Sequence, residues 1–454
     1  KPETIAAMGD KVTSRKRMQA AGVPIVPGST ETLSDEAAAA FALSIGLPVM
    51  VKASAGGGGK GLRFVSEEAQ LVPAIARARS EAQSSFGDDS LYVEKFVEEP
   101  RHVEIQILGD AHGNVIHLFE RECSIQRRHQ KVIEEAPANH MTPSLREQMG
   151  RAAVAAARAV GYEGAGTVEF LVDKHLAFYF LEMNTRVQVE HPVTELITNV
   201  DIVKTGIRIA AGEPIGIAQS EVGIYGWAIE CRIYAEDPDK FLPSPGVITS
   251  FRPPGGPGVR DDSGVCAGSE VSVFYDPMIS KLICWGRNRR EAIERMRRAL
   301  GEFVVTGIKT SIPFHRRVLE NEKFLSGRFD TSFIETEMAA KRLTGAPPSS
   351  EERELALMLA AIAVAGERPD ARCAVTLGSD THQVASKLIG AGCYDLRIDE
   401  GPAFRIEAVR SPGLPYSVLI AGRQRECSVE PRANGKLDVR IGASAFIVSV
   451  VPAG

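Results

Sequence analysis

Residues 167–191 read TVEFLVDKHLAFYFLEMNTRVQVEH, a run that places acidic and amide side chains among strand-forming aromatic and β-branched residues. Successive side chains of a strand point to opposite faces, so Thr167 and Glu169 share one face and Glu182 and Asn184 share one on a returning strand. With a turn at residues 174–177, Glu169 lies opposite Glu182. The run therefore predicts a hairpin that carries two neighbouring carboxylates.

Two carboxylates side by side in an otherwise apolar sheet repel each other and lose hydration. A divalent cation resolves both problems, and oxygen-only ligands with a nearby amide suit Mg²⁺ or Mn²⁺. We therefore expect Glu169, Glu182 and Asn184 to bind a metal ion. The alternative is two acids on the solvated face of an edge hairpin.

The composition indicates a water-soluble globular protein of more than one domain. The chain has 454 residues, a formal net charge of −5, 44% hydrophobic and 24% charged residues, enough to bury a large core. The mild acidity gives no sign of a nucleic-acid partner, and no apolar run is long enough to cross a membrane. Seven cysteines are scattered without a C-x-x-C pair, which favours buried free thiols in a reducing compartment.

Capping residues, periodicity and turn residues divide the chain into short elements. The composition changes after Gly226, where short strands are broken by Pro and Gly, and again after a linker-like segment at 344–350. We expect helices at 34–46, 142–161, 290–300 and 351–365, and strands at 48–52, 62–65, 91–97, 102–108, 416–420 and 436–441. The last hundred residues then form a small antiparallel β module that carries a helix.

A glycine-rich loop, Gly56-Gly-Gly-Gly-Lys-Gly61, lies between two of these strands. It is followed by a strand and not by the helix that a dinucleotide fold requires, and Gly61 stands where a Walker loop has Ser or Thr. Such a loop can still fold over a triphosphate, with Lys52 placed to neutralise phosphate charge. The alternative is a mobile surface loop.

Polar residues are also dense in the stretches 101–106 and 122–131. His102, Gln126 and His129 are candidate donors to a nucleotide or an oxyanion, and Lys131 with Arg127 or Arg128 is a candidate anion pocket. The alternative for each single residue is a solvated basic turn.

In the stretch that follows the proposed metal ligands, Arg186, Gln188 and Glu190 share a face if the chain is extended. A structural ion pair is the ordinary interpretation of an arginine near a carboxylate. Next to a metal site, the pair instead suggests a bound oxyanion and a general base.

Six stretches follow one another along the chain in a set order: GDK at 9–11, KASAGGGGKG at 52–61, RHVEIQ at 101–106, RRHQK at 127–131, EMNTRVQVEHPVTE at 182–195 and ECRIYAEDP at 230–238. Together they resemble biotin carboxylase, an ATP-grasp enzyme, over Lys1 to about Glu337. The resemblance implies ATP-dependent carboxylation of biotin by bicarbonate through carboxyphosphate, the first half-reaction of an acyl-CoA or pyruvate carboxylase.

The resemblance also implies residue roles. Bicarbonate would lie among Lys131, Arg186, Gln188 and the Val189 backbone, with Glu190 as the base, and Arg232 would stabilise the enolate-like oxygen of biotin. The metal ligands would be Glu169, Glu182 and Asn184. The nucleotide contacts would be Lys11, Lys52, Gly58, Gly59, Glu94, Lys95, Phe96, Val97, His102, Gln126, His129, Glu169, Leu171 and Glu182.

The resemblance predicts an α/β (α+β) protein in three parts: an ATP-grasp domain at 1–225 with a lid at about 25–97, a mixed biotin carboxylase C-terminal domain at 226–342, and a β-rich module at 351–454. Family members begin with a Rossmann-like subdomain of about a hundred residues, and we expect this chain to open after it. The module resembles, more weakly, the region before a biotinyl domain.

We expect one partner to be a biotinyl carrier on another domain or chain, because the sequence has no Ala-Met-Lys-Met site. The other expected partners are further copies of the chain and a carboxyltransferase subunit. The expected compartment is the bacterial cytoplasm or the mitochondrial matrix. Two other functions fit less well: an ATP-grasp ligase that joins a carboxylate to an amine, and a nucleotide-binding scaffold without catalysis.

Overall fold

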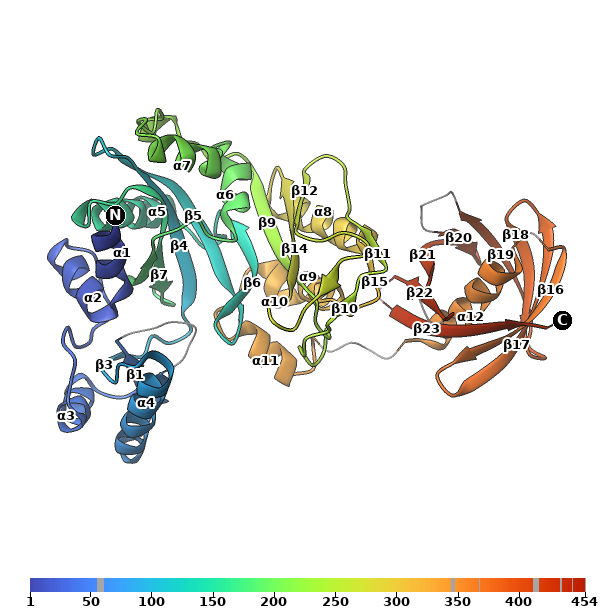
Figure 1. The fold of residues 1–454 in the computed structure, drawn as a ribbon, viewed down its shortest axis with the longest axis horizontal. Coiled ribbons are helices and arrows are strands. Elements are labelled where there is room, and N and C mark those ends of the chain that lie inside the picture. Colours follow the sequence, from blue (N-terminus) through green and yellow to red (C-terminus); the bar gives the residue numbers. More distant parts are fainter. Residues whose placement is uncertain are drawn as a thin grey trace.

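The computed structural model describes residues 1–54, 61–343, 348–366, 368–410, 416–432, 435–442 and 444–453. Figure 1 shows an elongated molecule in which the N-terminal part, a central part and a C-terminal barrel follow one another along the long axis. The glycines of the predicted flap, including Gly58 and Gly59, lie outside the described residues, as does most of the linker-like segment.

An eight-stranded antiparallel sheet is the backbone of the first two parts. Its strand order is β12-β14-β9-β6-β5-β4-β7-β8, so it runs across residue 226, where the composition changes. The strands are β4 (Arg101–Gly109), β5 (Val115–Arg127), β6 (Gln130–Ala136), β7 (Gly164–Val172), β8 (Phe178–Asn184), β9 (Trp227–Tyr234), β12 (Val259–Ser263) and β14 (Met278–Gly286).

Strand β4 explains how this sheet separates a core from a site. Val103, Ile105 and Ile107 are fully buried and pack in one cluster with Leu145 and Met149 of helix α5 (Pro143–Ala159). The alternate residues of β4 point to the opposite face, where the polar side chains lie. The predicted helix is confirmed, and Thr142 caps it by accepting a hydrogen bond from the Leu145 amide.

The N-terminal part carries a separate three-stranded sheet in the order β2-β1-β3. Its predicted helix α3 (Asp35–Ile45) begins after the Ser34 cap and ends at Gly46, whose φ of 76° suits a residue without Cβ. The other elements here are α1 (Pro2–Gly9), α2 (Lys11–Ala20), β1 (Val49–Ala53), β2 (Leu62–Val65), α4 (Leu71–Phe86) and β3 (Leu91–Lys95).

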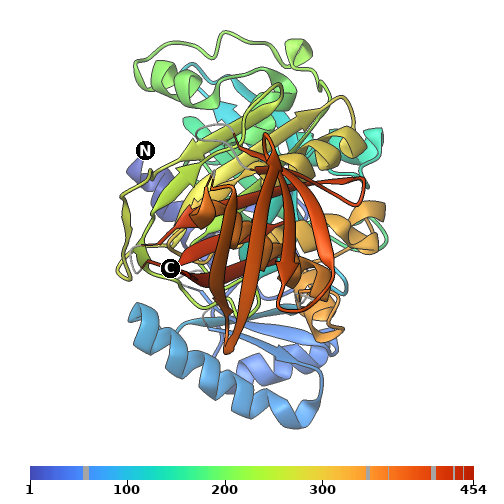
Figure 2. The same cartoon turned by 90° about the vertical axis from the view of Figure 1, so that its right-hand side faces the viewer.

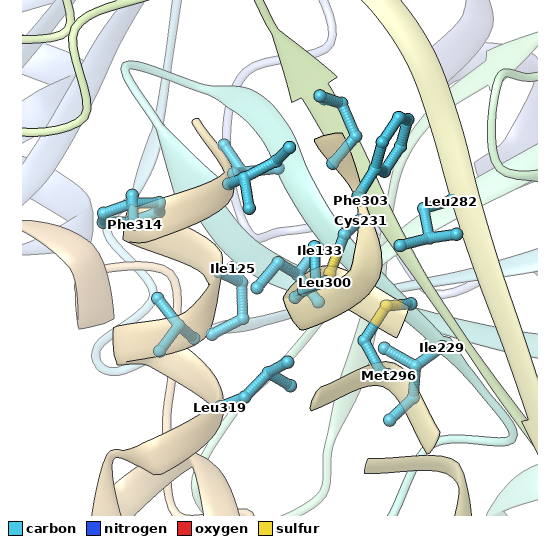
Figure 3. Packing of buried hydrophobic residues seen from close by; sticks show 14 of the residues in the cluster. Ile125, Ile133, Ile229, Cys231, Leu282, Met296, Leu300, Phe303, Phe314 and Leu319 are labelled. Atoms are coloured by element: carbon cyan, nitrogen blue, oxygen red, sulfur yellow. The ribbon is translucent and has the colours of Figure 1, made fainter. Parts of the chain in front are cut away.

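The central part packs helices on the face of β9 and β14. Helix α8 (Arg289–Glu302) inserts Met296 and Leu300 against Ile229 and Leu282 in the largest hydrophobic cluster, and Figure 3 shows these side chains together. The remaining elements of this part, with the helices that lead into it, are α6 (His191–Thr198), α7 (Ile202–Ala210), β10 (Gly246–Val247), β11 (Ser250–Arg252), β13 (Glu270–Val271), β15 (Val304–Thr306), α9 (Ile312–Glu320), α10 (Glu322–Ser326) and α11 (Phe333–Ala339).

The C-terminal part is a closed antiparallel barrel around one helix. Helix α12 (Ser350–Ala365) is apolar on most sides, with Leu355, Leu359 and Ile362 buried among barrel residues, as expected for a helix covered all round. Figures 1 and 2 show it enclosed by the strands. The prediction of a β module with a helix is confirmed, and closure removes the exposed strand edges. The strands are β16 (Asp370–Leu377), β17 (Asp380–Gly390), β18 (Cys393–Ile398), β19 (Ala403–Arg410), β20 (Tyr416–Ile420), β21 (Arg423–Pro431), β22 (Leu437–Ile441) and β23 (Ser444–Pro452).

Two bulk predictions can be compared with the structure. Within the described residues, no helix combines the length and the apolar character that crossing a bilayer needs. None of the seven cysteines forms a disulfide in the described structure, but Cys266 is exposed and Cys393 half-buried, so the expectation that every thiol is buried was wrong for these two.

Candidate active site

The predicted hairpin forms with the predicted register. Glu169 of β7 is paired with Glu182 of β8, and Thr167 with Asn184. Asn184 donates its Nδ2 hydrogen to Glu169 Oε1 at 2.9 Å. Burial and the negative charge of Glu169 raise the pKa of Glu182, because the nearby cations do not fully neutralise the charge of the two acids. This oxygen-rich pair fits a divalent cation.

Lys131 is the hub of the site. Its Nζ lies 2.8 Å from Glu169 Oε1 and 2.7 Å from Glu190 Oε1, and it also contacts Glu104. Burial would lower the pKa of Lys131, but the three carboxylates raise it well above its ordinary value. The amino group is therefore a fixed positive charge between the predicted metal ligands and the predicted base.

Behind Lys131 lies a second cation that the sequence reasoning missed. Arg121 of β5 is fully buried and forms an ion pair with Glu104 of β4, and it donates to Gln106 Oε1 at 2.7 Å and to the Thr167 and Thr194 hydroxyls at 3.0 Å. Burial would raise the pKa of Glu104, but Arg121 and Lys131 lower it to about 2. The signal was present as polar residues at every second position, 102, 104 and 106, of a strand with apolar neighbours.

Glu190 lies between two cations. Besides Lys131, it accepts a hydrogen bond from Arg232 Nη2 to Oε2 at 3.0 Å, and its side chain is fully buried. Arg232 Nε also donates to Glu134 Oε1 at 2.6 Å. Glu190 comes from the N-cap of α6 and Arg232 from β9, so residues far apart in the sequence meet here.

The loop between Asn184 and Glu190 corrects one expectation. It is not extended, and exposed Arg186 donates to Gln188 Oε1 at 2.9 Å instead of pairing with Glu190. Gln188 in turn donates to Glu169 Oε1 at 3.3 Å. The turn into α6, and not strand alternation, brings Gln188 and Glu190 to the site.

Val189 is held through its backbone by a residue that the sequence reasoning did not single out. Lys281 of β14 donates its Nζ hydrogen to the Val189 carbonyl at 3.0 Å and lies 3.4 Å from Asp262 Oδ2. This bond fixes the loop whose backbone was expected to contact bicarbonate.

On the lid side, three predicted nucleotide contacts come together. Lys52 forms an ion pair with Glu94, and both are buried. Lys11 is near enough to Glu182, Lys52 and Glu94 for their charges to act on it, and its pKa is lowered, chiefly by burial. Arg15, which the sequence reasoning missed, lies 2.9 Å from Glu94 Oε2.

The expected hinge leads from β3 toward β4. Lys95 Nζ donates to the Gly46 and Leu47 carbonyls at 2.8 and 3.0 Å, so its amino group holds the turn before β1. Phe96 packs edge-on against Phe64, with ring centroids 4.7 Å apart. Val97 and Leu171 are half-buried, and Leu171 is paired with His102 across β4 and β7.

His102 and Gln126 lie in the buried face of the site. His102 Nε2 is 3.0 Å from Glu169 Oε2, and its Nδ1 is 2.8 Å from Gln126 Nε2. Burial alone would lower the pKa of His102, but the charge of Glu169 and the hydrogen bond to it raise that pKa. His129 lies apart from them, exposed at the turn between β5 and β6.

The expected anion pocket of Lys131 with Arg127 or Arg128 was wrong. Arg127 makes two bonds to Glu236, of 2.6 and 2.9 Å, and stacks over Phe241. Arg128 is exposed in the turn, with a positive φ. Alternation along β5 sends Arg127 to the face opposite Lys131, because Gln126 and not Arg127 is the partner of Lys131.

Comparison with known proteins agrees with this arrangement. Residues 10–218 match the family model of the carbamoyl-phosphate synthase L chain ATP-binding domain, and residues 230–336 match the biotin carboxylase C-terminal domain. The biotin carboxylase of a Nostoc species is 53% identical over 336 residues, which are 74% of this chain and 75% of that protein. The chain belongs to the biotin carboxylase family.

Two further relatives support this assignment. Biotin carboxylase 1 of Bacillus subtilis is 53% identical over 74% of this chain and 75% of its own length. The biotin carboxylase domain of the Hydrogenobacter thermophilus 2-oxoglutarate carboxylase, solved as a dimer with MgADP, ADP and bicarbonate, is 48% identical, with a TM-score of 0.73 over 76% of each chain. The ATP-grasp fold of this family is therefore that of this chain, and ATP-dependent carboxylation of biotin is the chemistry of the family to which it belongs.

Proposed function

We propose that the side chains gathered around Lys131 activate bicarbonate with ATP and pass its carboxyl group to biotin. The observation that carries the proposal is Glu190, a fully buried carboxylate whose two oxygens are held by Lys131 and Arg232. A base must lie within hydrogen-bond reach of the proton that it removes, and these two cations would hold an anionic substrate at that distance from it.

In this proposal, Lys131, Arg186, Gln188 and the Val189 backbone bind bicarbonate, and Glu190 takes its proton. Gln188 is already bonded to Glu169, so the bicarbonate site and the metal site share a wall. Incoming bicarbonate would compete with Glu190 for the positive charge of Lys131. That competition leaves a carboxylate oxygen of Glu190 available to accept the proton as the oxyanion attacks the terminal phosphate.

Glu169, Glu182 and Asn184 would hold the magnesium ion, which supplies positive charge to the phosphates when bound. The chain's own cations complete the neutralisation. Lys11 and Lys52, on the lid side, would bind phosphate oxygens, and the hinge of Glu94, Lys95, Phe96 and Val97 with His102, Gln126, His129 and Leu171 would bind the rest of the nucleotide. Gly58 and Gly59 would cover it.

The carboxyphosphate formed in this way would release CO₂ and phosphate, and the phosphate would take the ureido proton of biotin. Arg232 would stabilise the negative charge that then develops on the ureido oxygen. Its guanidinium group lies 3.0 Å from Glu190 Oε2, so Arg232 would be close both to the activation of bicarbonate and to the transfer of the carboxyl group to biotin. A fixed guanidinium at a developing oxyanion is an effective catalyst because it needs no reorganisation.

The domain limits, partners and compartment extend the proposal. We place an ATP-grasp domain at 1–225, a biotin carboxylase C-terminal domain at 226–342 and the barrel module at 351–454. The two family matches, at 10–218 and 230–336, support the first division. The proposed partners are a biotinyl carrier, a second copy of the chain and a carboxyltransferase subunit, in a reducing compartment that suits free thiols.

The experiment is bicarbonate-dependent ATP hydrolysis, measured with and without free biotin. Wild-type protein should hydrolyse ATP only with bicarbonate. Glu190→Gln should lose that activity and still bind ATP, whereas Arg232→Ala should lose the stimulation by biotin. Unchanged turnover of Glu190→Gln would remove the proposed base.

A further inference from the structure

A second pair of acids lies behind Arg232. Glu134 of β6 is paired with Glu230 of β9 across the ladder, and both side chains are fully buried. Residues directly opposite in an antiparallel pair have Cβ atoms about 4.5–5.5 Å apart on the same face. The two carboxyl groups are therefore neighbours in the interior of the sheet.

These two carboxyl groups are poorly satisfied. Glu134 Oε1 accepts from Arg232 Nε at 2.6 Å. Among the described residues, Glu134 Oε2 and both oxygens of Glu230 have no hydrogen-bond partner. A buried ionised carboxylate without partners costs several kcal/mol, so a pair of ionised acids does not account for this arrangement. A protonated carboxyl group is a donor as well as an acceptor.

Burial and the nearby cations act on the pair in opposite directions, and burial prevails. Arg232 and Lys281 lower the pKa of Glu230, Arg232 and Lys131 lower the pKa of Glu134, and Glu190 raises both. The side packed by α6 and β14 is apolar there, through Val193, Ile197 and Ile283. Burial, and then the neighbouring acid, raise the pKa of Glu230 well above its ordinary value, and burial also raises the pKa of Glu134.

We propose that Glu230 is held protonated and donates its proton to Glu134, so that the pair shares one proton and one negative charge behind Arg232. Glu230 thereby acts as a positioning residue. It occupies the second oxygen of Glu134, leaves the first for Arg232 Nε, and so fixes the guanidinium face that reaches Glu190. A single shared negative charge also leaves Arg232 with positive charge to offer to a substrate oxyanion.

The protonation state can be tested without enzymatic activity. Infrared difference spectroscopy of the complete chain should show the carbonyl stretch of a buried protonated carboxylic acid, and this band should disappear in Glu230→Gln. Glu337→Gln is the matched control, because Glu337 is equally buried but holds bonds to Asn321, Lys323 and Arg342 and has a lowered pKa. If the spectrum of Glu230→Gln kept every band of the wild-type spectrum, the proposal would be overturned.

The positioning role rests on the proposed function and has its own kinetic test. Gln retains a donor for Glu134, whereas Met of similar size has none. Glu230→Gln should therefore stay within twofold of wild type in kcat/KM for free biotin at pH 7, and Glu230→Met should fall about tenfold, because an acceptor of Glu134 is left unsatisfied.

Equal biotin kinetics of the Gln and Met variants would overturn the positioning role. If wild-type protein showed no bicarbonate-dependent hydrolysis at all, the proposed function would fail while the infrared result would still decide the protonation state. The two failures are therefore distinguishable.

Discussion

Arg121→Met removes the most buried cation of the site while it keeps an unbranched side chain. Arg121 is fully buried and serves Glu104, Gln106, Thr167 and Thr194. Removing one partner of a buried ion pair costs about 3–5 kcal/mol, because the other charge remains buried. Lys131 still contacts Glu104, so we expect a loss near the lower end, about 3 kcal/mol.

The assay is urea unfolding followed by tryptophan fluorescence. The chain has two tryptophans, and Trp227 and Trp285 lie in β9 and β14, strands of the same sheet as β5. A loss of about 3 kcal/mol should lower the urea midpoint by about 1 M or more. Arg290→Met is the control, since Arg290 lies at the exposed surface of α8, where it pairs with Glu294, and its replacement should leave the midpoint unchanged.

A double variant sharpens the prediction for Arg121. Glu104→Gln removes the charge that Arg121→Met leaves uncompensated, so the double variant should recover part of the lost stability. The ion pair would not support the site as described if Arg121→Met had the same urea midpoint as Arg290→Met. The same conclusion would follow if adding Glu104→Gln to Arg121→Met lowered the free energy of unfolding by as much as Glu104→Gln does alone.

Three further predictions use other residues. His315 is fully buried, burial lowers its pKa to about 4, and its Nε2 lies within hydrogen-bond distance of the Arg232 carbonyl oxygen. Because the unfolded chain binds the proton more readily, the free energy of unfolding should fall by up to about 1.4 kcal/mol per pH unit from pH 6.5 toward 4. Thermal melts of His315→Gln should lack this pH dependence. Glu182→Gln should raise the melting temperature of the metal-free protein, since it relieves repulsion by Glu169, yet increase the Mg²⁺ needed for half-maximal ATP hydrolysis at least tenfold; a lower melting temperature and unaltered Mg²⁺ dependence would contradict the metal assignment. Lys281→Met frees the Val189 carbonyl and should raise the KM for bicarbonate without a comparable change in the KM for ATP, and steady-state kinetics that show the reverse would place Lys281 elsewhere in the mechanism.

Local patterns carried much of the fold. The Ser34 cap and Gly46 bounded α3, and two-residue alternation with a short turn gave the register that places Glu169 opposite Glu182. These features depend on neighbours within a few residues, which a sequence displays directly. The order of the three parts along the chain was predicted from the family motifs and not from local patterns.

The contacts that complete the site could not be derived in this way. Arg121 and Lys281 act through β4 and the Val189 loop, and the sequence gives no distance between such elements. Predictions made near turns of the chain were also wrong. Arg127 forms an ion pair with Glu236 away from the site, and the loop before Glu190 is not extended. Closure of the barrel around α12 likewise depends on pairing of β16 with β23 at opposite ends of the module.

The most direct test of the account is a crystal structure of the chain with magnesium, a non-hydrolysable ATP analogue and bicarbonate. The account predicts Mg²⁺ bound by oxygens of Glu169 and Glu182 at about 2.0–2.1 Å, with bicarbonate in contact with Lys131 and within hydrogen-bond reach of Glu190. An ion bound elsewhere, with Glu169 still held by Lys131 and bicarbonate absent from the neighbourhood of Glu190, would contradict it.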